Sequence, residues 1–214
     1  KPENKAQLQA ILTYHVVPGN VDASHEVKLT GATSLNGQQV SIRVDDNGVT
    51  VDGARVVKTD IECKNGVIHV IDQVILPSGD NLVQTAAKAD AFRTLVAAVK
   101  AADLVKALSG KGPFTVLAPT NAAFDKLPDG TLETLLKPEN KAKLQAILKL
   151  HVIPGRVYST DALKAGRAHT LQGGEIVFTV KNGQVYANGA KVVRTDIDAT
   201  NGVIHVIDSV ILPE

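Results

Sequence analysis

Apolar and polar residues alternate with two different periods along the 214 residues. In the middle of the chain, apolar positions recur at a helical spacing on one face: Phe92, Leu95, Val96 and Val99. Asp90 stands just before them and is expected to cap that helix. From 175 onward, β-branched runs are broken by Asn-Gly pairs that favour tight turns, at 182–183, 188–189 and 201–202. Helices followed by hairpins predict an α+β fold, with helices packed on an antiparallel sheet or sandwich.

Two further elements lie between these regions. A short apolar strand at 114–118 leads to Thr120 or Asn121, either of which can cap a short helix. A second helix places one set of residues on a common apolar face: Leu144, Ile147, Leu148 and His151. We expect this helix to end at Pro154-Gly155, because proline and glycine disfavour its continuation.

The chain contains an internal repeat. Residues 1–19 recur at 137–155 with 15 of 19 positions identical, and 65–77 recur at 201–213. Both pairs are offset by 136 residues, since 137 − 1 and 201 − 65 are equal. That offset is the size of a whole domain, so the sequence predicts tandem globular domains.

The repeat also predicts a truncated first domain. Residues 79–136 have no counterpart upstream, so 1–78 is expected to be the C-terminal portion of a domain and 79–214 a complete one. The linker is expected around 78–80, with Asp80 or Asn81 capping the next helix. We expect 79–136 to complete 137–214, which leaves one side of the sheet in 1–78 uncovered. That first portion is then either poorly packed or completed by another chain, for example by self-association.

Composition excludes several classes of partner. The chain has 23 Lys and Arg against 22 Asp and Glu, with 3% aromatic residues, so neither a basic patch nor stacking platforms for nucleic acid are expected. It has no apolar run of about 18 residues, so no membrane span is expected in this chain. Without any methionine, Lys1 is not expected to be the translation start, and a signal peptide would lie upstream. Cys63 is the single cysteine and has no partner for an internal disulfide.

Motifs for catalysis and cofactor binding are missing from the sequence. It has no His-Glu-x-x-His or paired-cysteine pattern for a metal and no Gly-x-Ser-x-Gly elbow for a serine hydrolase. The phosphate-binding Gly-x-x-x-x-Gly-Lys loop is also absent. The sequence therefore predicts a protein that is not an enzyme and that takes no cofactor or metal.

Three separated blocks resemble the fasciclin domain family. They are TVLAPTNAAF at 115–124, His151 followed by Val-x-Pro-Gly, and NGVIHVIDSVILP at 201–213. The amino-acid sequences of the blocks are most similar to those of bacterial members. The resemblance implies a fasciclin-like β-sandwich or wedge flanked by N-terminal helices, in a secreted or cell-surface protein, with a periplasmic location as a further possibility. It also implies cell adhesion, matrix association or surface attachment rather than catalysis.

The resemblance further implies candidate partner-binding residues. A Tyr-His pair and an Asp-Ile pair serve integrin recognition in animal matrix members, and they correspond to Tyr14-His15 and Asp60-Ile61. In the complete copy the counterparts are His151 and Asp196-Ile197, whereas leucine replaces the tyrosine at Leu150.

The histidines also have a structural interpretation. His15 and His151 lie on the apolar face of their helices, so we expect both to be buried and hydrogen-bonded. His69 and His205 lie in the middle of strands and are expected to be structural too.

Two functions follow as hypotheses. The first is a non-enzymatic extracellular module that binds a surface or matrix protein or a polysaccharide. The alternative is a protein that carries an apolar small ligand such as a carotenoid or lipid, in a cleft between helices and sheet. Only 14 of 45 positions match between 20–64 and 156–200, so this stretch either sets the partner of each copy or reflects free surface variation.

Overall fold

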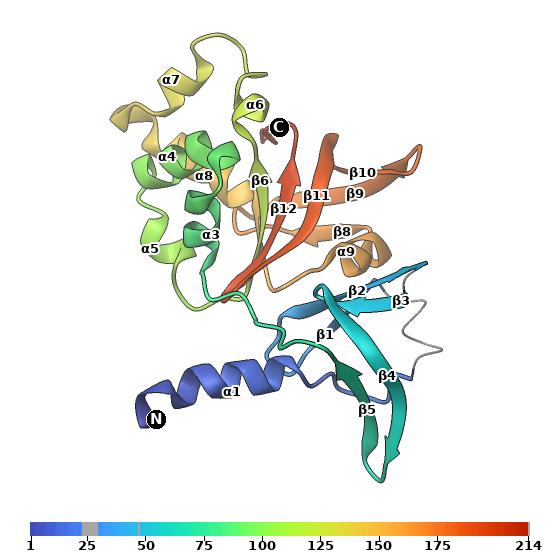
Figure 1. Ribbon diagram of the computed structural model, residues 1–214. Helices are drawn as coiled ribbons and strands as arrows, with labels where there is room; N and C mark the ends of the chain where they lie inside the picture. The colour runs from blue at the N-terminus through green and yellow to red at the C-terminus, as the bar shows by residue number, and fades with distance from the viewer. Residues whose placement is uncertain (23–29, 47, 214) are drawn as a thin grey trace. The chain divides into compact units, whose positions relative to one another are not determined.

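The computed structural model describes residues 1–22, 30–46 and 48–213. The chain forms two compact units, Lys1–Ser78 (unit 1) and Gly79–Glu214 (unit 2). Each unit combines helical elements with its own sheet, five-stranded in unit 1 and seven-stranded in unit 2 (Figure 1). Within the described ranges, none of the helices is both long enough and apolar enough to cross a bilayer.

The described residues of unit 1 form one α-helix and an antiparallel meander in the order β1-β2-β3-β4-β5. Its described elements are a 3₁₀ turn Pro2–Asn4, α1 Lys5–Tyr14, β1 Gly31–Thr33, β2 Gln39–Asp45, β3 Gly48–Val51, β4 Ala54–Cys63 and β5 Gly66–Ile71. Asp52 and Gly53 both take positive φ, 49° and 83°, and form the tight turn between β3 and β4. The buried core of this unit is small: Tyr14, Val40, Ala54 and Ile75.

Unit 2 is mostly helical in its first half and consists mainly of β-hairpins in its second half. Its helical elements are α3 Leu82–Lys88, a 3₁₀ turn Asp90–Phe92, α4 Arg93–Ala101, α5 Val105–Leu108, α6 Asn121–Phe124, α7 Thr131–Leu135, a 3₁₀ turn Pro138–Asn140, α8 Lys141–Leu150 and α9 Ser159–Ala165. Its strands are β6 Phe114–Pro119, β7 Val152–Pro154, β8 Arg167–His169, β9 Glu175–Lys181, β10 Gln184–Ala187, β11 Ala190–Ala199 and β12 Gly202–Ile207. The strand order is β7-β6-β12-β11-β10-β9-β8, and only β6 and β12 pair in parallel. The α+β prediction is therefore confirmed.

Two helix caps are formed by residues that the sequence predicted as caps. Asn81 caps α3 in a reciprocal capping box with Gln84, and the Thr120 hydroxyl accepts a hydrogen bond from the Ala123 N–H at the start of α6. In each case the structure selects one of the two residues that the sequence allowed.

The predicted cap of α4 is wrong. Asp90 lies in a 3₁₀ turn, and α4 begins only after Phe92. The Thr94 N–H instead donates to the Asn121 Oδ1 at 3.0 Å, and Asn121 Nδ2 donates to the Asp90 carbonyl at 2.8 Å. A side chain from the distant β6–α6 junction thus satisfies a helix N-terminus that a local residue was expected to cap.

The predicted end of the helix that contains Leu144 is also wrong. Helix α8 ends at Leu150, and residues 152–154 form β7, which pairs antiparallel with β6 through Thr115 and Ile153. The edge of β6 offers backbone partners to this segment, and its β-branched residues Val152 and Ile153 fit a strand. Tertiary pairing therefore overrides the local helix signal.

The Asn-Gly turns are confirmed at two of three positions. Both residues have positive φ at Asn182-Gly183 (51° and 72°) and at Asn188-Gly189 (45° and 84°). The third differs, because Gly202 is the first residue of β12. A Cβ there would lie 2.0 Å from the Phe114 carbonyl oxygen, so this glycine allows β6 to approach closely.

Unit 2 has two apolar cores. One lies between the helices and the sheet and contains Leu95, Leu144 and Ile204, and Figure 1 shows α3, α4 and α8 grouped beside β6 and β12. The second joins Leu117 of β6 to Ile176 of β9. Because β12, β11 and β10 separate those two strands, the sheet has to bend on itself to bring them together. That bend produces the wedge expected of the fold.

Residues 79–136 cover one face of residues 137–214, as predicted. In the first core, Leu82 and Leu95 pack together with Leu144 and Ile204. The described residues of unit 1 include no such segment, and Ile68, the counterpart of Ile204, is 51% exposed rather than 1%. The side of the unit 1 sheet that carries β5 and α1 therefore presents apolar side chains to solvent.

Candidate binding site

Tyr14 ends α1 and is buried at 5% exposure. Its hydroxyl lies 2.6 Å from Asp52 Oδ2 and 3.1 Å from the Gln39 carbonyl oxygen. Asp52 belongs to the β3–β4 turn, so this hydroxyl joins the end of the helix to the sheet. Tyr14 is thus held by unit 1 itself.

His15 and His151 occupy the same place in the repeat but differ in burial. The structure contradicts the prediction for His15, which is exposed, and confirms it for His151, which is 3% exposed. Both rings place Nδ1 2.8 Å from the carbonyl four residues earlier, in Ile11 and Ile147. The difference arises because β6 lies beside His151, whose carbonyl accepts from the Leu117 N–H at 2.8 Å. Among the described residues of unit 1, none forms a counterpart of β6.

His151 is held neutral inside unit 2. The Ile211 N–H donates to Nε2 at 3.0 Å, so Nδ1 carries the proton and donates to the Ile147 carbonyl. Burial lowers the pKa of His151 to about 4, against the smaller raising effect of the Ile147 carbonyl. Both ring nitrogens are therefore engaged by the backbone.

The two Asp-Ile pairs lie at equivalent β-bulges. Asp60 and Asp196 take positive φ, 55° and 60°, where the pairing of β4 with β5 and of β11 with β12 is irregular. Asp196 accepts hydrogen bonds from the Ser159 N–H at 2.8 Å and from its hydroxyl at 2.5 Å. Ile197 packs against the helical core of unit 2. In unit 1, Asp60 is exposed and Ile61 is half-buried.

The structure puts the candidate residues of unit 1 in two adjoining hollows. A cleft of about 390 Å³ is lined by Tyr14 and His15 among others, and a second hollow contains Asp60. Gly19 and Val67 line both. The Tyr-His and Asp-Ile pairs therefore lie in neighbouring regions and do not share one pocket.

The strand histidines are structural, as predicted. His205 Nε2 is 2.9 Å from the Val157 carbonyl oxygen, and His69 Nε2 is 2.8 Å from that of Val21. The Asp196 N–H donates to His205 Nδ1 at 3.2 Å, which places the proton of the neutral ring on Nε2. Burial lowers the pKa of His205, and the Val157 carbonyl and Asp196 oppose that shift more weakly.

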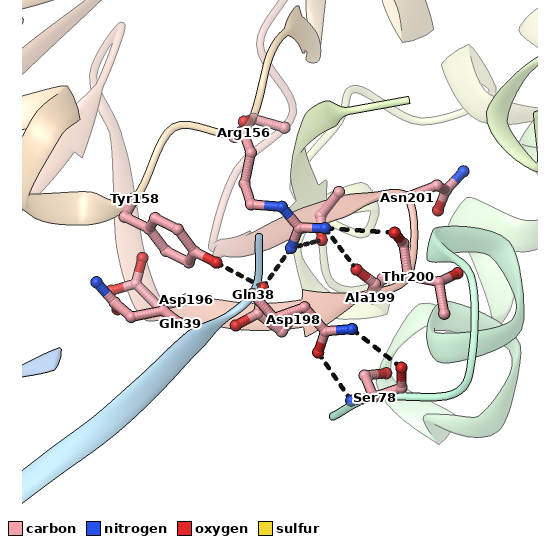
Figure 2. A network of polar contacts seen from close by, with 12 residues as sticks. Gln38, Gln39, Ser78, Arg156, Tyr158, Asp196, Asp198, Ala199, Thr200 and Asn201 are labelled. Carbon is pink, nitrogen blue, oxygen red and sulfur yellow. Dashed lines mark hydrogen bonds and ion pairs between the residues drawn. The ribbon is translucent and has the colours of Figure 1, made fainter. Parts of the chain in front are cut away.

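Sequence reasoning missed a polar network around Arg156 (Figure 2). The guanidinium pairs with Asp198 and donates to the carbonyls of Gly202 at 2.7 Å and Ala199 at 2.8 Å. The Tyr158 hydroxyl donates to Asp198 at 2.9 Å. The Arg156 and Asp198 side chains are only 12% and 15% exposed, so the network joins the segment after β7 to the β11–β12 hairpin away from bulk water.

Burial and the charges of this network shift the pKa of the Tyr158 phenol. Burial raises the pKa of Tyr158, and the Asp198 carboxylate raises it further, while Arg156 lowers it. Tyr158 is thus neutral and a donor at physiological pH. The one sequence signal was the difference between copies, since Asn20 and Asp22 stand at the counterparts of Arg156 and Tyr158.

Two hydrogen bonds join a buried side chain of unit 1 to the backbone at the end of that unit. Gln38 is 3% exposed, donates from Nε2 to the Ser78 carbonyl at 3.1 Å and accepts from the Ser78 N–H at 2.8 Å (Figure 2). Gly174 occupies the equivalent position in unit 2, which therefore lacks the side chain that makes these contacts.

Two features concern bound ligands: the metal-binding side chains of the described residues and the apolar cavity of unit 2. Among them, no three His, Cys, Asp or Glu side chains come together in a group that could hold a metal ion. An apolar cavity between the helices and sheet of unit 2 measures about 40 Å³ and is lined by Leu95 and Ile204 among others. That volume is far below the roughly 300 Å³ at which small-molecule pockets begin.

Similar proteins occur in cyanobacteria and in animals. Protein sll1483 of Synechocystis sp. is 54% identical over 144 residues, which cover 67% of this chain and 79% of that protein. Transforming growth factor-beta-induced protein ig-h3 of Sus scrofa is 36% identical over 215 residues, or 97% of this chain and 31% of that protein. Human periostin is 36% identical over 170 residues, or 78% of this chain and 20% of that protein. The chain thus spans less than a third of these two animal relatives.

The fold also matches a solved structure, and a family model matches both units. A FAS1 domain pair from the insect cell adhesion molecule Fasciclin I superposes with a TM-score of 0.59 at 19% identity, covering 99% of this chain and 82% of that one. The model of the Fasciclin domain matches residues 1–77 and 90–213. The chain therefore belongs to the fasciclin domain family.

Proposed function

We propose that this chain is a non-enzymatic adhesion module that acts outside the cell or at its surface, through contacts with a matrix or surface protein or with polysaccharide. The observation that carries the proposal is that the Fasciclin domain matches both units. A solved structure that shares the fold comes from a cell adhesion molecule. Two fasciclin units in one chain would add avidity to weak individual contacts.

The state of the buried polar groups supports a role without catalysis. The side chains of His151, His205 and Asp198 in unit 2 are all engaged in hydrogen bonds within the protein. A catalytic base needs a pKa close to the working pH and access to substrate, whereas His151 is buried with a pKa of about 4. These groups hold the fold together and leave binding to the surface.

The exposed candidate residues are proposed to make the partner contacts. His15 and Asp60 are exposed, and Ile61 is half-buried beside Asp60. The remaining candidates are assigned to positioning, because two are buried and two are half-buried in contact with other elements of unit 2: Tyr14 and His151, then Asp196 and Ile197. Adhesive contacts would then come from unit 1.

The alternative of carotenoid or lipid carriage receives less support. The apolar cavity of unit 2 holds about 40 Å³, so an acyl chain or a carotenoid would require the helices to move away from the sheet. We therefore place adhesion first.

Retention of the purified full chain tests the proposal on intact cells, on extracted matrix and on glycan arrays. We expect binding that falls about tenfold in Asp60→Ala, a loss equivalent to one good polar contact. Asp90→Ala is the matched control, since its carboxylate is also exposed but lies in unit 2. If the unaltered chain is retained on none of these surfaces, the adhesion proposal fails.

A further inference from the structure

Three side chains form a row across the outer side of β9, β10 and β11 in unit 2. Thr179 pairs with Tyr186, and Tyr186 pairs with Lys191, so the three residues lie side by side on neighbouring strands (Figure 1). The adjacent row on the same strands consists of buried residues of the second core: Phe178, Ala187 and Ala190. Because successive residues of a strand point to opposite faces, the first row points away from that core. We call Thr179, Tyr186 and Lys191 the outer row.

The outer row is accessible. Thr179 is exposed, and Tyr186 and Lys191 are half-buried. None of these three side chains makes a hydrogen bond or an ion pair with another residue that the structure describes. The other two tyrosines differ, because Tyr14 and Tyr158 are buried and their hydroxyls are bonded to aspartates. Both the hydroxyl and one edge of the Tyr186 ring are therefore open to a ligand.

The charge around the outer row is positive. Lys181 of β9 lies on the same side as Thr179 and is exposed. Two acidic residues border the row, and each is already paired with a cation: Glu175 with Arg167 at 3.6 Å and Asp208 with Lys126 at 3.0 Å. Lys181 and Lys191 therefore attract a negatively charged ligand to this surface.

The two copies keep the inward residues of these strands and change the outward ones. The compared segment has seven inward positions, three on β9, two on β10 and two on β11, which are apolar in both copies and identical at four. At the seven outward positions from Glu175 to Lys191, four on β9, two on β10 and one on β11, each residue differs from its counterpart in unit 1. The outer row itself replaces Arg43, Thr50 and Arg55. The units thus share a scaffold and present different surfaces, as expected if each surface has its own partner.

The spacing of the outer row suits a linear polysaccharide. Neighbouring strands are about 4.8 Å apart, so the three side chains stand at nearly equal steps over roughly 10 Å. One such step is close to the length of a pyranose unit in an extended polymer. A chain of sugars that crosses the strands would therefore place one ring over Tyr186 and the next rings over Thr179 and Lys191.

Each side chain of the outer row fits a different part of an acidic sugar. The C–H face of a pyranose packs on an aromatic ring, and the tyrosine hydroxyl reaches a sugar hydroxyl at the ring edge. The Thr179 hydroxyl can donate and accept, and the Lys191 ammonium donates to a carboxylate. A protein partner usually buries a large apolar anchor in a pocket, whereas this row offers one ring between two polar groups. The chemistry therefore favours a saccharide.

We propose that the outer row of unit 2 binds an acidic polysaccharide, with Tyr186 as the stacking platform and Lys181 and Lys191 as carboxylate contacts. This inference rests on the proposed function, because it names polysaccharide as the partner and adds a contact in unit 2 to those of unit 1. Binding to one row is weak and sensitive to salt, since its cations are exposed to solvent.

Calorimetric titration of the full chain with a hexamer of galacturonic acid at pH 7 measures the binding. We expect an affinity that falls as NaCl is raised, together with amide chemical-shift changes confined to 177–193. Cellohexaose has no carboxylates and should bind at least about tenfold more weakly. Hexaglutamate tests an acidic peptide, and binding as tight as that of the sugar acid would overturn the assignment to polysaccharide. Failure of the galacturonate hexamer to bind would overturn it as well.

Matched variants locate the site. Tyr186→Thr installs the residue of unit 1, keeps a side chain suited to a strand and should weaken binding about tenfold. Tyr186→Phe keeps the ring and should stay within about threefold of the unaltered chain. Lys191→Met should both weaken binding and flatten its salt dependence. Thr50→Ala changes the counterpart in unit 1 and should have no effect. Unchanged affinity in Tyr186→Thr and Lys191→Met would show that the outer row is not the site.

The titration and the retention assay can fail separately. If the galacturonate hexamer binds through Tyr186 while the chain is retained on neither cells nor matrix, the outer row is supported and adhesion is rejected. If retention depends on Asp60 and the hexamer does not bind, adhesion is supported and the outer row is rejected.

Discussion

The backbone N–H of Ile211 donates a hydrogen bond to Nε2 of His151 across 3.0 Å, at the point where the chain leaves β12 and returns to the end of α8. A protonated imidazole has no lone pair for this bond, so charging His151 breaks it and puts a cation in the core. The folded state therefore requires the neutral ring.

We therefore expect the free energy of unfolding to decrease as the pH is lowered. The pKa of His151 is about 4 in the folded state, below its ordinary value of 6.5, so the unfolded chain binds more protons between these two pH values. The free energy of unfolding is then complete above pH 6.5 and declines by about 3 kcal/mol as the pH falls to 4. His205, whose pKa is also lowered by burial, adds to the decline. Denaturant titrations of unit 2 at successive pH values measure the slope.

Exchanging the two helix-end histidines for glutamine provides the control. His151→Gln should flatten the slope and lower stability at pH 7, because the Ile147 and Ile211 backbone groups lose their partner. His15→Gln should leave both unchanged, since His15 is exposed. An unaltered slope in His151→Gln would assign the pH dependence to other groups.

Gly202 and Gly66 should differ in their tolerance of a methyl group. Gly202→Ala places Cβ against the Phe114 carbonyl, which is backbone and cannot rotate away, so we expect a loss of about 3 kcal/mol in unit 2. Gly66→Ala meets open space and should change stability by no more than about 0.5 kcal/mol. Thermal unfolding of the two full-length variants compares them directly, and equal losses would refute the close approach of β6.

The N-terminus of α4 should depend on Asn121 rather than on Asp90. Asn121→Ala removes the acceptor for the Thr94 N–H, and such a loss at a helix N-terminus costs about 1 kcal/mol. Asp90→Ala should cost well under 1 kcal/mol, because its carboxylate makes only an exposed ion pair with Arg93 at 3.3 Å among the described contacts. Urea unfolding of both variants distinguishes them, and a larger loss in Asp90→Ala would restore the local cap.

The Arg156–Asp198 pair should be costly to break from one side. Arg156→Met leaves the Asp198 carboxylate largely buried and removes donors from the Gly202 and Ala199 carbonyls, so we expect a loss of about 3 kcal/mol. Arg167→Met is the control, because its pairing with Glu175 at 3.6 Å is exposed and should contribute under about 1 kcal/mol. A double-mutant cycle of Arg156→Met with Asp198→Asn measures the coupling, and additive effects would mean that the two side chains do not stabilise each other.

Sequence reasoning predicted the helices, the hairpins and the uncovered side of unit 1 because each depends on local pattern or on the repeat. The Asn-Gly turns at 182 and 188 follow from the positive φ that these residues accept. The exposure of Ile68 follows because residues 79–136 have no counterpart within 1–78. The prediction was wrong where a distant partner competes with a local signal, as at Asp90 and at residues 152–154.

The candidate site was the least predictable part. Family resemblance pointed to Tyr14 and Asp60 but not to their surroundings: a buried hydroxyl bonded to Asp52 in one case, an exposed β-bulge in the other. The Arg156 network joins residues 42 positions apart, and no periodicity links them. Its only trace was the difference between the two copies.

By itself, the sequence determined the α+β order of elements, the 136-residue repeat and the apolar residues that the two copies share, since these depend on spacing along the chain. The tertiary structure alone decided that His151 is buried while His15 is exposed, and that Gly202 is crowded while Gly66 is open. In both pairs the residues are identical and their local sequences nearly so. Whether a residue is buried depends on what packs against it. Here residues 79–136 cover 137–214, and no described residues cover unit 1 in the same way.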